Sequence, residues 1–231
     1  VSSSEELALL PDDYDLVIHC AASGGGGEPA YREVYLQGAR CLISRYPNAR
    51  LIFTSSTSVY PQEDHSLVTE LSEANPPNPT AQILREAEQC VIAASGIVAR
   101  LSGLYGPERC HVLKNLLSGD ARIDGAGERI MNFVHRDDVA DAMLMLAEMD
   151  VFLGGEIYNI TAEPVSQFGC YTMLSDHFSV PMPGEQQGAV KRKRGNSSKR
   201  VSNAKLKNLG WQPRYEDFLS LALACQAGKQ I

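Results

Sequence analysis

The sequence predicts an α/β fold built on a doubly wound parallel sheet, from three observations. Short, mostly apolar runs that are typical of buried strands occur at 15–21, 50–54 and 97–101. Segments with apolar residues at helical spacing separate these runs, at 28–45 and 81–94. Connections of helix length between consecutive strands are typical of parallel pairing, with helices covering both faces of the sheet.

Each of these elements is bounded by residues that end regular structure. The first strand ends at Ser23 and a run of four glycines, 24–27, which we interpret as a flexible loop. Pro47-Asn48 stops the first helix, and Ser95-Gly96 ends the second. The pattern therefore predicts both the type and the limits of each element.

The second half of the chain is less regular. We expect a helix with Asp137 or Asp138 as its N-cap, a strand at 156–160 and a helix at 167–178. The basic run at 191–194 is interpreted as a solvated loop, and the alternatives are a nuclear signal or a phosphate-binding patch.

Composition and charge exclude several classes of protein. The 231 residues are 44% hydrophobic and 21% charged, which is an ordinary globular mix. Acidic residues outnumber basic ones 28 to 21, which argues against nucleic acid as a partner, and no apolar run approaches the ~18 residues of a membrane span. The six cysteines show neither a C-x-x-C pair nor zinc spacing. We therefore expect reduced, buried thiols, no metal, no membrane and a cytoplasmic location.

Ligand sites in such sheets lie at the carboxyl ends of the strands, here 21–27, 54–60 and 102–107. The second segment, Thr-Ser-Ser-Thr-Ser-Val-Tyr, carries five hydroxyl side chains in succession, a dense set of hydrogen-bond donors and acceptors. The alternative is a hydroxyl-rich turn that caps its own backbone.

Six segments follow one another in the order found in a known protein family, and the resemblance covers about residues 13 to 220. The chain resembles an atypical or extended short-chain dehydrogenase/reductase, and more narrowly the NAD-dependent epimerase/dehydratase family. The segments are His19-Cys-Ala-Ala-Ser23, Phe53-Thr-Ser-Ser-Thr-Ser-Val-Tyr60, Arg100-Leu-Ser-Gly-Leu-Tyr-Gly-Pro107, Asn132-Phe-Val-His-Arg-Asp-Asp-Val-Ala140, Ile157-Tyr-Asn159 and Lys207-Asn-Leu-Gly-Trp-Gln-Pro213.

The resemblance implies a fold, a cofactor and a site. Residues 1–150 would form a partial Rossmann-like dinucleotide-binding domain, and 151–231 mainly a small α/β substrate region. NAD or NADP would be the cofactor, and the substrate a sugar-like or other small hydroxy or keto compound. Ser56 would hydrogen-bond the substrate oxygen. Residues expected to contact the cofactor are Ala21, Ala22, Ser23, Thr54, Ser55, Ser102 and Gly103.

The catalytic Tyr-x-x-x-Lys pair of the family is missing. Thr80 stands where the tyrosine belongs and Leu84 where the lysine belongs. A threonine hydroxyl is a far weaker acid than a phenol, and leucine has no charge to lower a neighbouring pKa. Tyr60 and Tyr105 are the alternative phenols, although aromatic residues at such positions more often line a pocket. Met131 replaces an arginine that suits a diphosphate, which argues against a UDP-sugar substrate.

The first predicted strand matches the fourth strand of the family, so on the order of 60 residues of the family pattern have no counterpart here. The chain contains no G-x-x-G-x-x-G turn for a pyrophosphate. We expect the exposed sheet edge to make the isolated chain poorly soluble or to pair it with a second copy. Three hypotheses remain: an atypical member of the family whose native chain carries the cofactor turn, a ligand- or NAD(P)-sensing pseudoenzyme, and an inactive truncated fragment.

Overall fold

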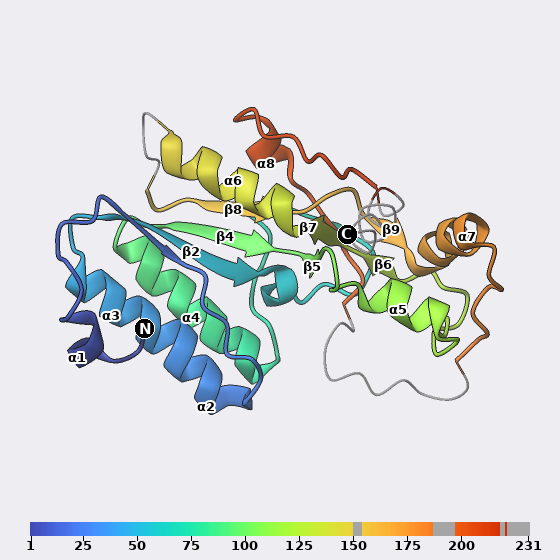
Figure 1. Cartoon of the computed structure of the whole chain (residues 1–231), viewed down its shortest axis with the longest axis horizontal. Helices are drawn as coiled ribbons and strands as arrows, with labels where there is room; N and C mark the ends of the chain where they lie inside the picture. The colour runs from blue at the N-terminus through green and yellow to red at the C-terminus, as the bar shows by residue number, and fades with distance from the viewer. Residues whose placement is uncertain (150–153, 187–196, 218–219, 221–231) are drawn as a thin grey trace. The chain divides into compact units, whose positions relative to one another are not determined.

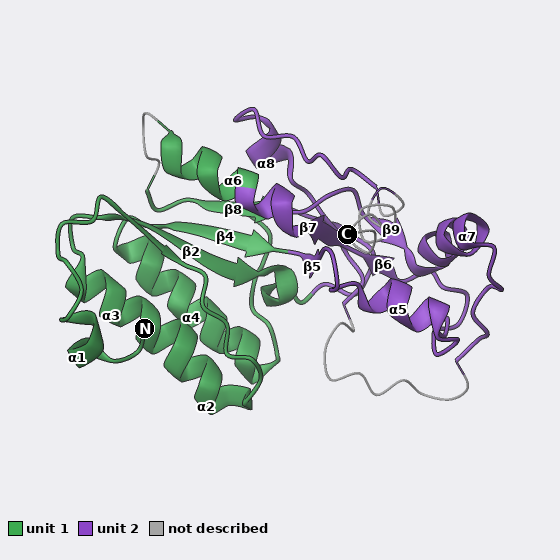
Figure 2. Cartoon of the chain, in the orientation of Figure 1, with its two compact units in different colours: residues 1–61, 70–101, 141–160 green, residues 62–69, 102–140, 161–231 purple. Residues whose placement is uncertain are grey.

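The computed structural model describes residues 1–149, 154–186, 197–217 and 220 of the chain (Figure 1). They divide into two compact units that alternate along the sequence (Figure 2). Unit 1 comprises 1–61, 70–101 and 141–160, and unit 2 comprises 62–69, 102–140 and 161–231. The sequence predicted a boundary near 150, whereas residues 102–140 cluster with the C-terminal part of the chain. The assignment of 151–231 to substrate binding stays a prediction.

Unit 1 contains a four-stranded, fully parallel sheet in the order β1-β2-β4-β8. The predicted fold class is therefore confirmed. The strands are β1 (Leu16–His19), β2 (Arg50–Ser56), β4 (Ile97–Leu101) and β8 (Ile157–Ile160), each overlapping a predicted strand. β1 forms one edge of this sheet, and the pairing of that edge with a second copy stays a prediction.

Helices lie on both faces of this sheet (Figure 1). One face is covered by α2 (Gly27–Tyr31), the π-helix η1 (Arg32–Gln37), α3 (Gly38–Arg45) and α4 (Pro79–Ala93), and α1 (Ser4–Leu7) packs on α3. The unit 1 portion of α6 (Arg136–Glu148) lies on the other face. The sheet interior is apolar, because Ile52, Phe53 and Val98 are fully buried.

The glycine run leads directly into the helical run predicted at 28–45. All four glycines, 24–27, have positive φ, and Gly27 is itself the first residue of a helical run that continues to Arg45. Gly26 is the N-cap in the left-handed region, at φ 81°, which glycine adopts without steric cost. The helix predicted at 28–45 is therefore present directly behind the glycines, and the interpretation of the glycine run itself as a flexible loop stays a prediction.

Unit 2 is built from short strand pairs. Two are parallel, β3 (Leu67–Val68) with β10 (Arg200–Val201) and β5 (Gly103–Tyr105) with β7 (Phe133–His135), and β6 (Ile130–Met131) pairs antiparallel with β9 (Val165–Ser166). Its helices are α5 (His111–Leu117), α7 (Gln167–Phe178), which confirms a prediction, and α8 (Ala204–Lys207). The short 3-10 helix η2 (Thr57–Val59) belongs to unit 1.

Two further expectations from the sequence concern membrane spans and cysteines. None of the helices in the described part of the chain is long and apolar enough to cross a membrane. Five cysteines are described and all are free, but Cys20 is exposed, so the expectation of buried thiols fails there. Cys225 and the basic run at 191–194 lie outside the described residues.

Candidate functional site

The hydroxyl side chains at the end of β2 point to different partners. Ser55 is buried, and its hydroxyl donates a 2.6 Å hydrogen bond to a carboxylate oxygen of Glu88 on α4. Ser56 is half-buried, and its Oγ accepts the Ser58 N–H at 3.1 Å, so it caps η2. The Thr54 hydroxyl donates to the carbonyl oxygen of His19 at 3.2 Å. Alternation along a strand explains the division, since neighbouring side chains point to opposite faces.

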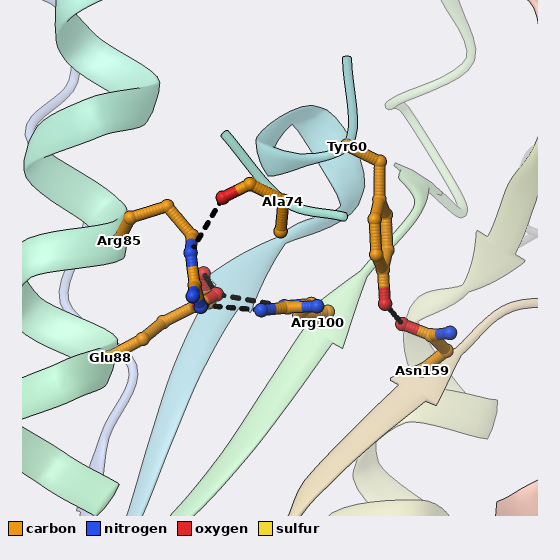
Figure 3. A network of polar contacts seen from close by, with 7 residues as sticks. Tyr60, Ala74, Arg85, Glu88, Arg100 and Asn159 are labelled. Carbon is orange, nitrogen blue, oxygen red and sulfur yellow. Dashed lines mark hydrogen bonds and ion pairs between the residues drawn. The ribbon is translucent and has the colours of Figure 1, made fainter. Parts of the chain in front are cut away.

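The Glu88 carboxylate, to which Ser55 donates, is the centre of a buried network of ion pairs and hydrogen bonds; Figure 3 shows its contacts with Arg85 and Arg100. The Glu88 carboxylate is fully buried and accepts hydrogen bonds from Nε and Nη2 of Arg100, at 3.0 and 2.7 Å. Arg85 donates a further bond to Glu88 and is itself held by the Ala74 carbonyl oxygen. Burial alone would lower the pKa of Arg100, but its hydrogen bonds and charge pairing with Glu88 raise it. The network therefore joins α4, β2 and β4, and the structure gives Ser55 a structural partner rather than an exposed hydroxyl.

Tyr60 lies on the other side of Arg100. Its side chain is buried and its hydroxyl donates a 2.8 Å hydrogen bond to the amide oxygen of Asn159 on β8. The Arg100 guanidinium lies 4.7 Å from the centroid of the Tyr60 ring. Burial raises the pKa of Tyr60, although Arg100 and Asn159 oppose that rise. A catalytic role for Tyr60 stays a prediction, and its burial and raised pKa disfavour it.

The two positions that the resemblance aligns with the family's catalytic pair, Thr80 and Leu84, both lie on α4. The Thr80 hydroxyl donates to the Oδ1 of Asn78 at 2.8 Å, next to the N-cap bond from its own amide. Leu84 is buried. Thr80 therefore belongs to the start of the helix, and neither position supplies a phenol or an ammonium group.

The residues after β1 form the most open part of the predicted cofactor edge. Ala21 and Ala22 are exposed and carry small side chains, so their backbone can be approached closely. The Ser23 amide donates a 3.4 Å hydrogen bond to the hydroxyl oxygen of Tyr35 in η1. Unit 1 thus brings together the exposed segment after β1 and the half-buried Ser56, since β1 and β2 are paired in parallel up to His19 and Phe53.

The remaining cofactor residues belong to unit 2. The Ser102 hydroxyl is buried and has no hydrogen-bond partner among the described residues. At Gly103, a Cβ atom would lie 3.0 Å from the Asn132 carbonyl oxygen, a tight contact, so the pairing of β5 with β7 favours a glycine there. Tyr105, the second candidate phenol, is buried and lies edge-on to His135 at 5.2 Å.

The start of α6 also departs from the sequence prediction. The helix begins at Arg136, so neither Asp137 nor Asp138 is the N-cap. The Asp137 amide donates instead to Nδ1 of His135 at 3.2 Å. Asp138 is fully buried, and its two carboxylate oxygens accept the backbone amides of Arg214 and Tyr215 at 2.8 and 3.2 Å. Asp138 therefore anchors the segment that contains Arg214 and Tyr215, because each of its carboxylate oxygens accepts a charge-assisted hydrogen bond from a backbone amide of that segment.

Comparison with known proteins identifies the family. The sequence model of the NAD dependent epimerase/dehydratase family matches residues 2–161. The chain belongs to this family. Protein YeeZ of Escherichia coli (strain K12) is 37% identical over 172 residues, which make up 70% of this chain and 58% of YeeZ. The chain thus spans less than two thirds of this relative.

Solved structures agree with the fold of the family. The UDP-glucuronic acid 4-epimerase from Bacillus cereus, in complex with UDP-glucuronic acid and NAD, superposes with a TM-score of 0.78 at 21% identity, over 98% of this chain and 78% of that one. A putative NAD-dependent epimerase/dehydratase from Methylobacillus flagellatus gives a TM-score of 0.79 at 25% identity, over 100% and 82%.

Within this epimerase/dehydratase fold, sequence reasoning missed the network around Glu88 and Arg100. A signal was present, because Arg100 is a charged residue inside the otherwise apolar strand 97–101. A charge in a buried strand requires a partner, and Glu88 on the preceding helix is the carboxylate that faces it. Among the described residues no group of three His, Cys, Asp or Glu side chains is placed to hold a metal ion.

Proposed function

We propose that this protein binds NAD or NADP together with a small hydroxy or keto substrate, sugar-like in its chemistry, as an epimerase/dehydratase-type protein without the Tyr–Lys relay. The observation that carries the proposal is the edge formed by the exposed Ala21 and Ala22 after β1 and by Ser56, the last residue of β2. Family membership supports it, and so do the fold neighbours whose names include NAD and nucleotide sugars.

The chemistry of Ser56 suits a substrate oxygen. Its Oγ accepts the Ser58 amide, which leaves its own O–H free to donate. A bound nicotinamide would supply hydride acceptance or donation, and Ser56 would orient the substrate oxygen beside it. Small residues at 21 and 22 fit the ribose and nicotinamide part of a dinucleotide. The 231 residues contain no G-x-x-G-x-x-G turn for the pyrophosphate, so we expect binding no tighter than ~100 μM.

A second candidate is a non-catalytic protein that binds a ligand or senses NAD(P). The observation in its favour is the state of the two relay positions, Thr80 and Leu84, and of the alternative phenol, Tyr60. The Thr80 hydroxyl is bonded to Asn78, and both Leu84 and Tyr60 are buried. A proton relay needs a titratable group within reach of the substrate, and these positions supply none at the open edge. The buried Met131 in place of an arginine weighs against a diphosphate-linked sugar.

Calorimetric titration of NAD⁺, NADH, NADP⁺ and NADPH distinguishes the candidates when it is followed by a turnover assay, read at the nicotinamide absorbance, with a panel of small sugars and hydroxy or keto compounds that carry no diphosphate. We expect saturable binding of at least one dinucleotide and roughly three- to tenfold weaker binding of the compound that is turned over to Ser56→Ala. The exposed Ser118→Ala in unit 2 is the matched control and should bind as the unmodified chain does. Binding with turnover supports the first function, and binding without turnover supports the second. Absence of saturable binding by all four dinucleotides contradicts both.

A further inference from the structure

The helical run from Gly27 to Arg45 is interrupted by one turn with a different hydrogen-bond pattern. In an α-helix the Gly38 N–H would bond to the Val34 carbonyl, four residues earlier. Here it is directed to the carbonyls of Glu33 and Tyr35 instead, within the π-helix η1. The Val34 carbonyl is thereby available to a group outside the helix. Such π-helical turns are often found at functional sites.

The group that uses this carbonyl is the ring of His19, the last residue of β1. Nε2 of His19 lies 3.0 Å from the Val34 oxygen. Because a carbonyl can only accept, Nε2 carries the hydrogen and the neutral ring has no hydrogen on Nδ1. Burial lowers the pKa of His19, which favours this neutral form. The ring also contacts Phe53 of β2 edge-on at 5.2 Å.

Gly38 makes this contact sterically possible. A Cβ atom at Gly38 would lie 2.9 Å from Nε2 of His19. Any side chain at Gly38 would therefore push the imidazole away from the Val34 carbonyl.

The next residue of the same turn holds the other end of the segment that follows β1. The Tyr35 hydroxyl accepts the Ser23 amide at 3.4 Å, and the Tyr35 ring lies edge-on to Phe53 at 6.4 Å. Val34 and Tyr35 are adjacent, and their partners His19 and Ser23 flank residues 20–22. One irregular turn thus fixes the backbone on both sides of the exposed Ala21 and Ala22.

We propose that His19 and Tyr35 are positioning residues, and that the π-helical turn sets the place of the backbone at 20–27. The consequence for ligands rests on the proposed function: the ribose and nicotinamide of a dinucleotide would bind against a segment whose conformation is prepared by η1. Ordering a loop before binding removes part of the entropy that a ligand would otherwise have to overcome.

Amide hydrogen exchange of the segment 20–27, read by mass spectrometry, tests the proposal in the intact chain without any ligand. Tyr35→Phe deletes one oxygen atom and is expected to speed exchange there by roughly two- to tenfold, the range for one lost hydrogen bond. Tyr14→Phe makes the same deletion at an exposed ring elsewhere in unit 1 and should leave the segment unchanged. His19→Leu should act as Tyr35→Phe does, and His19→Gln, which retains a donor near the Nε2 position, should restore part of the protection.

Calorimetry with NAD⁺ on the same variants supplies the functional readout. Tyr35→Phe should weaken NAD⁺ binding by a similar factor while its urea midpoint stays close to that of Tyr14→Phe. Unchanged exchange at 20–27 in both Tyr35→Phe and His19→Leu overturns the positioning role. Faster exchange with undiminished affinity overturns its link to the ligand. If the unmodified chain binds no dinucleotide while exchange responds as expected, the positioning role stands and the proposed function fails.

Discussion

Replacement of Glu88 by glutamine should destabilise the protein severely, because it removes the negative charge that two buried or partly buried guanidinium groups share. Glu88 is fully buried and Arg100 is 1% exposed, while the Arg85 side chain is 24% exposed. Glutamine keeps the shape and one acceptor oxygen but leaves Arg100 without a counter-charge. Breaking a buried ion pair by removing one partner costs about 3–5 kcal/mol of the free energy of unfolding.

The matched control lies two residues away on the same helix. Glu86 pairs with Arg32 at 3.2 Å, but these side chains are 45% and 57% exposed, so solvent screens the pair. Glu86→Gln should therefore cost at most about 1 kcal/mol. Urea unfolding of both variants, followed by far-UV circular dichroism, measures the difference. The reasoning is refuted if Glu88→Gln and Glu86→Gln lie within about 1 kcal/mol of each other.

Three further predictions concern neighbouring groups. Ser55→Ala should lower the free energy of unfolding by about 1.5–3 kcal/mol, since it removes a hydrogen bond to the charged Glu88 carboxylate. Ser56→Ala loses only the neutral cap bond to Ser58 and should cost at most about 1 kcal/mol; urea unfolding checks both. Tyr60→Phe should cost about 1–3 kcal/mol, because a buried amide oxygen of β8 loses its 2.8 Å donor, and thermal unfolding measures that loss. Burial lowers the pKa of His135 below its ordinary 6.5, so the unfolded chain binds a proton more readily than the folded chain does. The free energy of unfolding should therefore fall as pH drops below about 6.5. Urea titrations between pH 7 and 5 measure this slope, and His135→Asn should reduce it.

The sequence predicts the elements of unit 1 well because each carries a clear local signal. Apolar runs of strand length mark β2 and β4, and helical spacing with a breaker at Ser95-Gly96 marks α4. The N-cap prediction fails at Asp138, because an aspartate that is suited to cap a helix is equally suited to bind backbone amides of a distant segment. The Asp138 carboxylate is taken by amides 76 and 77 residues further along the chain. No local pattern can report a partner at that separation.

The candidate site shows the same division. Order and spacing of the motifs predict the segments that form the edge, and the family match confirms the family that they imply. Adjacent residues within one segment nevertheless have different roles: Ser55 bonds the buried Glu88, and Ser56 keeps a free O–H at the edge. That difference depends on which face of the sheet α4 covers, and a run of hydroxyl residues does not indicate which face that is.

By itself, the sequence determines the alternation of strands and helices, the family, and the absence of a Tyr-x-x-x-Lys spacing from the 231 residues, because each of these is a property of residue type and spacing. Tertiary structure alone decides that the Tyr60 ring packs against the Arg100 guanidinium and that Glu88 on α4 binds residues of β2 and β4. It alone also decides that a backbone carbonyl of the π-helical turn binds the ring of His19. Hydrogen bonds and ion pairs between distant segments depend on three-dimensional placement, and a buried polar group is tolerated only where folding brings its partner to it.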